Sequence, residues 1–133
     1  MADNNDILVQ VENLKIHFFT NEGTVRAVDG VTFDIHSGKT LCMVGESGCG
    51  KSVTARALLQ IVHRPGKIVD GDIILHRRKS QDQTEKVHIS DMEPKGRAIR
   101  SIRGKEISMI FQEPMTSLSP MYTVGNQIME TVI

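Results

Sequence analysis

The sequence has 133 residues, the length of one ordinary domain, and its 39% hydrophobic and 24% charged content excludes a disordered chain. Sixteen basic residues balance sixteen acidic ones, which argues against the basic surface that nucleic-acid binding requires. We see no signal-peptide pattern at the N-terminus, and no apolar run approaches the roughly 18 residues of a membrane-spanning helix. We therefore expect a globular domain with reduced cysteines and no nucleic-acid partner.

The first third of the chain has the residue pattern of antiparallel strands joined by tight turns. After it, residues 40–44 (TLCMV) are almost continuously apolar, which predicts a strand buried on both faces of a sheet. The expected antiparallel strands cover residues 7–11, 14–19, 25–28 and 31–35, with a hairpin turn at 21–23.

The remaining elements alternate between helices and strands. Apolar residues at helical spacing predict a helix from Ser52 to about Val62, and capping-box spacing at 90–93 predicts a second, short helix that ends near Ile102. The polar residues 76–88 are expected to form a surface loop. The other expected elements are strands at 71–75 and 107–111 and a helix from Tyr122 onward, with Val124, Ile128, Met129 and Val132 on its apolar face.

Residues 45–52 (GESGCGKS) match the phosphate-loop pattern G-x-x-x-x-G-K-[ST] between a predicted buried strand and a predicted helix. The glycines allow the backbone torsions and close approach that turn successive N–H groups toward an anion. Lys51 would place its ammonium over the β- and γ-phosphates, and the Ser52 hydroxyl is a suitable ligand for Mg²⁺. The predicted phosphate-binding residues are Gly45, Glu46, Ser47, Gly48, Cys49, Gly50, Lys51, Ser52 and Val53.

Several motifs together resemble the ATP-binding subunits of bacterial ABC importers of the oligopeptide/dipeptide (peptide/nickel) family. The motifs are VENLK (11–15), AVDGV (27–31), the phosphate loop, IRGKEI (102–107) and FQEPMTSLSP (111–120). The resemblance implies an α/β fold, a P-loop NTPase of ABC type with an antiparallel β-subdomain and the start of a mixed core sheet. It implies three parts: the β-subdomain at about 6–38, the P-loop core at about 39–112, and the Q-loop with the start of the helical subdomain at about 113–133.

The same resemblance assigns roles to residues outside the phosphate loop. Phe18 falls at the position of the aromatic that stacks on adenine, with Phe19 and His17 as alternative neighbours. Gln112 matches the Q-loop glutamine, whose carbonyl oxygen ligates Mg²⁺ and whose amide orients the attacking water. The implied cofactors are ATP and Mg²⁺, and the implied activity is ATP hydrolysis coupled to transport.

Two family motifs are missing from the 133 residues. The sequence contains no LSGGQ-like string and no run of four apolar residues followed by Asp-Glu, the Walker B pattern. We therefore expect an N-terminal fragment that ends within the helical subdomain and does not hydrolyse ATP by itself. The expected catalytic set is incomplete: Gln112 would position water and Mg²⁺, and Ser52 would be a second ligand of Mg²⁺.

The resemblance also implies partners and a location. These are a second ATP-binding subunit (in a homo- or heterodimer), transmembrane permease subunits, and indirectly an extracytoplasmic substrate-binding protein, at the cytoplasmic face of the cell membrane. Three alternatives remain open at this stage: an importer of nickel or another small cargo, a non-catalytic nucleotide-binding remnant, and a soluble P-loop kinase or GTPase. The kinase or GTPase is disfavoured because the chain has no N/TKxD motif and no substrate lid.

Overall fold

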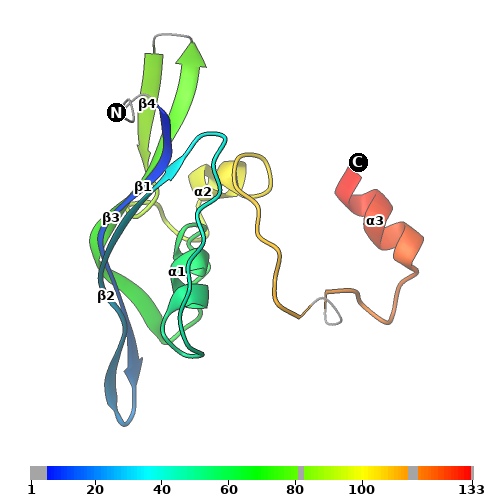
Figure 1. Ribbon diagram of the computed structural model, residues 1–133. Coiled ribbons are helices and arrows are strands. Elements are labelled where there is room, and N and C mark those ends of the chain that lie inside the picture. Colours follow the sequence, from blue (N-terminus) through cyan, green and yellow to red (C-terminus); the bar gives the residue numbers. More distant parts are fainter. Residues whose placement is uncertain (1–5, 81–82, 114–116, 133) are drawn as a thin grey trace.

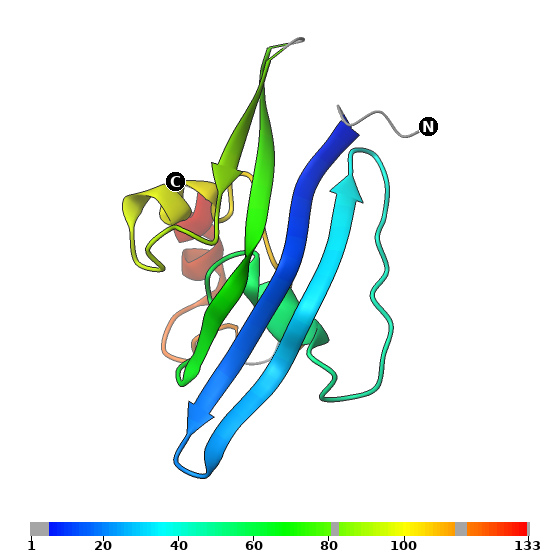
Figure 2. The same ribbon diagram turned by 90° about the vertical axis from the view of Figure 1, so that its left-hand side faces the viewer.

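The computed structural model describes residues 6–80, 83–113 and 117–132, so part of the predicted Q-loop motif, residues 114–116, lies outside the described residues. Four antiparallel strands form one sheet in the order β2-β1-β3-β4, and α1 and α2 lie on one face of it (Figures 1 and 2). The elements are β1 (Ile7–Thr20), β2 (Gly23–His36), α1 (Lys51–Ala57), β3 (Gly66–Ser80), β4 (Gln83–His88), α2 (Arg97–Ile102) and α3 (Val124–Val132).

Strands β1 and β2 form one long hairpin, which confirms the predicted antiparallel arrangement and the turn between them. The predicted strand segments are not separate, however, because each pair joins into a single strand of 14 residues. The register of β1 shifts between Val11 and Leu14, where Asn13 has a φ of 46° and its N–H donates to Thr32 Oγ1 at 2.9 Å. This irregularity accommodates the two residues between Val11 and Leu14, where the alternation of apolar and polar side chains is interrupted, so β1 continues through them.

The expected surface loop at 76–88 is wrong. Residues 76–80 form the last third of β3 and residues 83–88 form β4, and the two pair as an antiparallel ribbon. Charged side chains connect the two strands, since Glu85 lies 3.4 Å from Arg77 and 3.2 Å from Lys79. A polar composition therefore indicated solvent exposure correctly, but it did not exclude strand pairing between oppositely charged neighbours.

The predicted helix from Ser52 to Val62 is shorter than expected. Helix α1 ends at Ala57, and the chain then turns through the next three residues. Gln60 has a φ of 54°, a left-handed conformation that a right-handed helix cannot contain. Its side-chain amide donates to the Ile89 and Ser90 carbonyl oxygens at 2.8 and 3.1 Å, so contacts distant in sequence set the end of the helix.

The second predicted helix ends where expected but begins later. Helix α2 starts at Arg97 after Gly96, which provides no side-chain cap, so the predicted capping box at 90–93 is wrong. The Ser90 hydroxyl donates instead to the Asp72 carboxylate on β3. Burial opposes ionisation of Asp72, but hydrogen bonds from Ser90 and His88 outweigh it and lower the pKa of this carboxyl.

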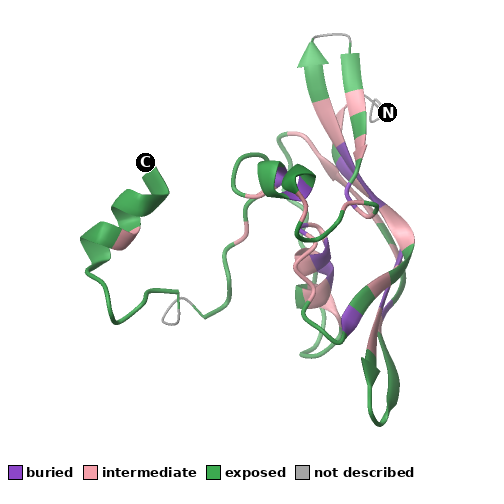
Figure 3. Cartoon of the chain, turned by 180° about the vertical axis from the view of Figure 1, so that it is seen from behind, coloured by how far each residue is buried: buried purple, intermediate pink, exposed green. Residues whose placement is uncertain are grey.

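The hydrophobic core lies between the sheet and the two helices α1 and α2 (Figure 3). It takes inward-facing residues of β1, β2 and β3, one residue of α1, two of α2, and Ile89, which directly follows β4. Strand alternation explains this selection, because every second residue of a strand points to the same face. The buried core residues are Val9, Val11, Leu14, Ile16, Val28, Ala57, Ile73, Leu75, Ile89, Ile99 and Ile102.

The two predicted core strands at 40–44 and 107–111 are not formed. Residues 40–46 and 108–111 are extended but pair with no strand in the described part of the chain, and Ile107 makes a single parallel bridge to Arg103. Val44 is 92% exposed and Ile110 is 98% exposed. An apolar run predicts the tendency to form a strand, but a strand also needs neighbours that supply ladder hydrogen bonds.

This exposure gives a direct test at Val44. We expect Val44→Ser to change the free energy of unfolding of this chain by no more than about 0.5 kcal/mol, as at other surface positions. The same substitution at Val11, which is 0% exposed, should lower it by about 2 kcal/mol or more. Urea denaturation of both variants measures the free energies of unfolding. If Val44→Ser lowered this free energy as much as Val11→Ser, residues 40–44 would form a buried strand after all.

Helix α3 confirms the predicted helix near the end of the sequence. It begins at Val124, it has no buried residue, and it stands apart from the sheet and from the other helices (Figures 1 and 3). Its predicted apolar face is exposed, since Val124, Ile128 and Met129 are each more than half exposed. No helix in the described residues combines the length and apolar character needed to cross a membrane.

Candidate nucleotide-binding site

The predicted phosphate loop connects the extended segment 40–44 to α1. Gly50 precedes the helix with a φ of 92°, and Gly48 has a φ of 82°, so both need the conformational freedom of glycine. A Cβ on Gly50 would lie 2.5 Å from the Ala27 carbonyl oxygen of β2. The loop therefore packs directly against the antiparallel sheet, and this contact fixes where the loop lies.

Lys51 is the most strongly bonded side chain of the loop. Its ammonium donates to the Gly45 carbonyl at 2.6 Å, the Glu46 carbonyl at 2.7 Å and the Cys49 sulfur at 3.2 Å. An ammonium has three N–H donors, so two of them hold the side chain across the loop and the third meets a weak acceptor. A phosphate oxygen is a much stronger acceptor than sulfur, so an anion in the loop would readily take this third donor.

The start of α1 also offers backbone donors. Gly50 provides no side-chain cap for the helix. Residues 45–50 are all described, and among them one backbone hydrogen bond is formed, from Cys49 N–H to the Glu46 carbonyl at 3.3 Å. Helices leave their first N–H groups without helical partners, and the helix dipole adds partial positive charge there. These groups and the Lys51 ammonium together fit a phosphate chain.

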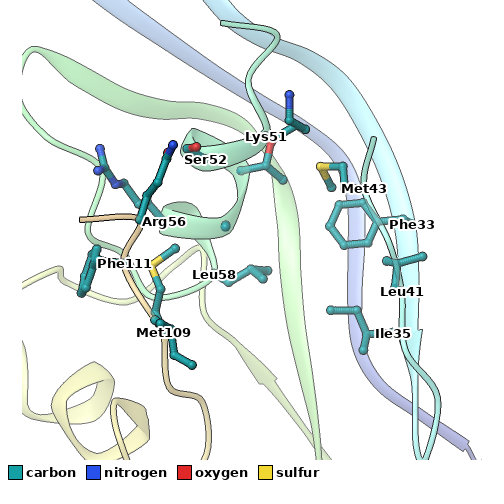
Figure 4. A pocket seen from close by; sticks show the side chains of 14 residues that line it. Phe33, Ile35, Leu41, Met43, Lys51, Ser52, Arg56, Leu58, Met109 and Phe111 are labelled. Atoms are coloured by element: carbon teal, nitrogen blue, oxygen red, sulfur yellow. The ribbon is translucent and has the colours of Figure 1, made fainter. Parts of the chain in front are cut away.

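A cavity of about 520 Å³ opens beside α1 (Figure 4). Segment 40–44 and β2 line one wall, residues 109–112 line the opposite wall, and α1 lies between them. The walls are mostly apolar, while Ser52 and Gln112 are both part of the lining. The structure thus brings the two predicted Mg²⁺ ligands to one cavity, although 60 residues separate them in sequence.

The ligand set for a divalent cation is small. Ser52 and Gln112 offer two neutral oxygens, and the described residues contain no group of three or more His, Cys, Asp or Glu side chains that could hold a metal. Mg²⁺ commonly keeps several waters and takes phosphate oxygens of the substrate together with one or two protein ligands. The residues present therefore fit Mg²⁺ that arrives with a nucleotide, and they do not fit a site for the ion alone.

Phe18 lies on the face of β1 that packs toward α1. Its ring rests beside Gly66, where a Cβ would come within 2.7 Å of Phe18 Cε1, and the ring is partly buried against the core. Phe19 and His17 point to the opposite face, with ring centroids 6.3 Å apart. Of the three residues considered for adenine stacking, only Phe18 shares a face with the phosphate loop, and stacking remains a prediction.

Two features of the site were missed by the sequence analysis. Arg56 lines the cavity together with Ser52, and the spacing of four residues on one helix could have indicated this shared face. The contact between Gly50 and the Ala27 carbonyl involves main-chain atoms. Residue types carry no signal for such a contact.

The Lys51–Cys49 contact has a chemical consequence. The hydrogen bond from the Lys51 ammonium lowers the pKa of the Cys49 thiol, so a larger thiolate fraction is present near neutral pH. We expect iodoacetamide to modify Cys49 faster than Cys42, which is also exposed, with the rate rising at lower pH than for an ordinary thiol. Peptide mapping by mass spectrometry measures both rates. Lys51→Met should slow the reaction at Cys49 alone, and an unchanged rate would contradict the role of this contact.

Comparison with known proteins identifies the family. The sequence pattern of the ABC transporter family matches residues 28–132, which include the phosphate loop, α1 and Gln112. The chain belongs to the ABC transporter family. Phe18 lies before the matched region, so its role is not supported by this match.

Similar proteins extend the comparison to nearly the whole of this ABC-family chain. It is 44% identical over 128 residues to the probable peptide ABC transporter ATP-binding protein y4tR of Sinorhizobium fredii (strain NBRC 101917 / NGR234), covering 96% of this chain and 35% of y4tR. It is 45% identical over 127 residues to the oligopeptide transport ATP-binding protein AppD of Bacillus subtilis (strain 168), covering 95% of this chain and 35% of AppD.

A third relative is the glutathione import ATP-binding protein GsiA of Escherichia coli (strain K12). It is 43% identical over 125 residues, which are 94% of this chain and 19% of GsiA. The chain thus spans about a third of the length of y4tR and AppD and about a fifth of GsiA.

Proposed function

We propose that this chain is the ATP- and Mg²⁺-binding part of the energy-coupling subunit of an ABC importer of peptides. The observation that carries the proposal is the phosphate loop at 45–52, with its lysine held by two loop carbonyls and its helix start free of a side-chain cap. The names of y4tR and AppD support peptides or oligopeptides as the cargo. The family and these relatives favour this reading over a kinase or GTPase.

The proposed roles follow from the chemistry of each group. The backbone N–H groups from Gly45 to Val53 and the Lys51 ammonium bind the phosphates, and Phe18 supports the adenine ring. Ser52 and Gln112 hold Mg²⁺, which neutralises phosphate charge when it is bound with ATP. Gln112 is neutral, so it can orient a water molecule without competing as a base.

The partners and the location are further parts of the proposal. ATP would bind between this chain and a second ATP-binding subunit, and permease subunits would receive the movement produced when the two close. The importer would also work with an extracytoplasmic substrate-binding protein, and this chain would lie peripherally at the cytoplasmic face of the membrane. The β-subdomain, P-loop core and helical subdomain keep the proposed bounds of about 6–38, 39–112 and 113–133.

A chimera tests whether this chain can serve in an oligopeptide importer. The aligned part of AppD, 127 residues at 45% identity, is replaced by this chain, and uptake of labelled oligopeptides is measured in cells that lack AppD. We expect the chimera to restore uptake and its Lys51→Ala variant to fail. A matched chimera in GsiA tests glutathione uptake. A chimera that reaches the membrane and binds ATP in both hosts but restores only glutathione uptake would overturn the oligopeptide assignment.

The purified chain by itself is expected not to hydrolyse ATP at a measurable rate. The 133 residues contain no LSGGQ-like string and no apolar strand ending in Asp-Glu, so they lack an acid that could handle the attacking water. A single-turnover assay with excess protein and radiolabelled ATP makes the measurement. Hydrolysis that disappears in the Lys51→Ala variant would contradict the expectation, because it would show a complete catalytic set in this chain.

A further inference from the structure

Gly66 lies directly opposite Phe18 in the sheet, and the Phe18 ring rests on it. The two residues are cross-strand partners in β3 and β1. A Cβ built on Gly66 would lie 2.7 Å from Phe18 Cε1 and 2.8 Å from Phe18 Cζ, whereas carbon atoms in contact keep about 3.5–4.0 Å. The ring therefore occupies the space that a side chain at position 66 would fill, as an aromatic side chain does when it covers a facing glycine.

Val62 borders the same space from another side. Its Cγ1 would lie 2.8 Å from the Cβ added to Gly66. Val62 and Phe18 are both partly buried and pack against the hydrophobic core. Since Val62 belongs to the stretch between α1 and β3, the place of the Phe18 ring depends on this connection as well as on the sheet.

Main-chain hydrogen bonds fix the strands around the ring. Gly66 N–H donates to the His63 carbonyl at 2.8 Å, which closes the turn that leads into β3, and Phe19 N–H donates to the Pro65 carbonyl at 3.3 Å. Gly66 is buried and does not have a positive φ, so its backbone conformation is open to other residues. What this position requires is the lack of a side chain.

We infer that Gly66 is a positioning residue for Phe18. Its lack of a Cβ lets the ring lie close to the sheet, which sets the place where the ring supports a base beside the phosphate loop. Gly66 acts through the ring and offers no side chain of its own to the site. The inference rests on the adenine role proposed for Phe18. With alanine at position 66 the ring must turn away, because a contact of 2.7 Å cannot be kept.

Ring resonances test the positional part without any nucleotide. The chain has four phenylalanines, so NMR of the protein with isotope-labelled phenylalanine rings is simple to assign, and Phe18→Leu identifies the Phe18 signals. We expect Gly66→Ala to shift these signals. Gly125→Ala is the matched control, since its added Cβ has nothing within 4 Å, and it should leave them unchanged. Unchanged Phe18 signals in Gly66→Ala would overturn the inference.

The ratio of the dissociation constants of magnesium tripolyphosphate and MgATP tests the consequence at the site, because it isolates the contribution of the base and the sugar. We expect Phe18→Ala and Gly66→Ala each to lower this ratio by about 10-fold, within the range that stacking on an aromatic contributes. Tripolyphosphate affinity should stay within about twofold, because the loop N–H groups and Lys51 bind phosphates without the ring. A general loss of structure would instead weaken the binding of both ligands.

The double variant Phe18→Ala/Gly66→Ala tests whether the two residues act in series. We expect its ratio to equal that of Phe18→Ala, because Gly66 has no effect on the base once the ring is gone. Additive losses in the double variant would overturn the inference, since they would show that Gly66 acts by a route other than the Phe18 ring.

Two outcomes separate the inference from the function on which it rests. If Gly66→Ala moved the Phe18 signals while Phe18→Ala left the ratio unchanged, the adenine role of Phe18 would be overturned and the positioning role would stand. If Phe18→Ala lowered the ratio and Gly66→Ala did not, the positioning role would be overturned.

Val62→Ala keeps the test decisive if Gly66→Ala does not fold. It removes the methyl groups that border the space of the ring, so the ring gains freedom to move. We expect shifted Phe18 signals and a ratio between those of the wild type and Phe18→Ala, with tripolyphosphate affinity unchanged. Phe18 signals that stay in place in Val62→Ala would then overturn the inference.

Discussion

Replacement of Lys51 by alanine is expected to weaken MgATP binding by about 100- to 1,000-fold. A charge pair at about 4 Å contributes on the order of 4 kcal/mol at an effective dielectric near 20. Binding is weakened and not abolished, because the loop N–H groups of the variant still bind the phosphates. The effect should be large because the Gly45 and Glu46 carbonyls already hold the ammonium across the loop. Isothermal titration of the purified chain with MgATP measures the loss.

Lys39 provides the matched control for this substitution. It is an exposed lysine six residues before the loop begins, so Lys39→Ala removes the same charge from the chain without touching the site. We expect its MgATP affinity to stay within about twofold of the wild type, since exposed charges are strongly screened by salt. Equal losses at Lys39 and Lys51 would show that net charge, and not the phosphate loop, governs binding.

Replacement of Gly50 by alanine is expected to lower the free energy of unfolding by about 2 to 4 kcal/mol. The left-handed backbone costs a residue with a Cβ about 1–2 kcal/mol. The added Cβ would also lie 2.5 Å from the Ala27 carbonyl oxygen, so the loop must move away from β2. We therefore expect the same variant to lose most of its ATP affinity, measured by titration beside urea denaturation.

Two other glycines separate the causes of this loss. Gly48 has a φ of 82° but nothing within 4 Å of an added Cβ, so Gly48→Ala should show only the backbone cost of about 1–2 kcal/mol. Gly125 in α3 has neither constraint, and Gly125→Ala should be neutral or stabilising by up to about 1 kcal/mol. If Gly50→Ala lowered the free energy of unfolding no more than Gly48→Ala, the close contact with Ala27 would not contribute to the loss.

Much of the antiparallel sheet could be predicted because its signals are local. The β1–β2 hairpin was predicted from its turn residues and alternating strands, and the helix at α3 was predicted from its apolar spacing. The β3–β4 ribbon was missed, since its strands are polar and are stabilised by cross-strand pairs such as Arg77–Glu85. Such pairs depend on which residues lie opposite each other, and residue order alone does not give this register.

The sequence by itself determined the phosphate loop, because the spacing of its glycines, lysine and serine is a local chemical requirement. It also determined the family, through motifs that extend from the first strands to Gln112. Only the tertiary structure decided that the loop packs against Ala27, that Arg103 donates to the Leu59 carbonyl after α1, and that Glu106 pairs with Arg77 of β3. It also decided that the apolar segments 40–44 and 107–111 form no strands, since a strand depends on hydrogen bonds to a neighbour.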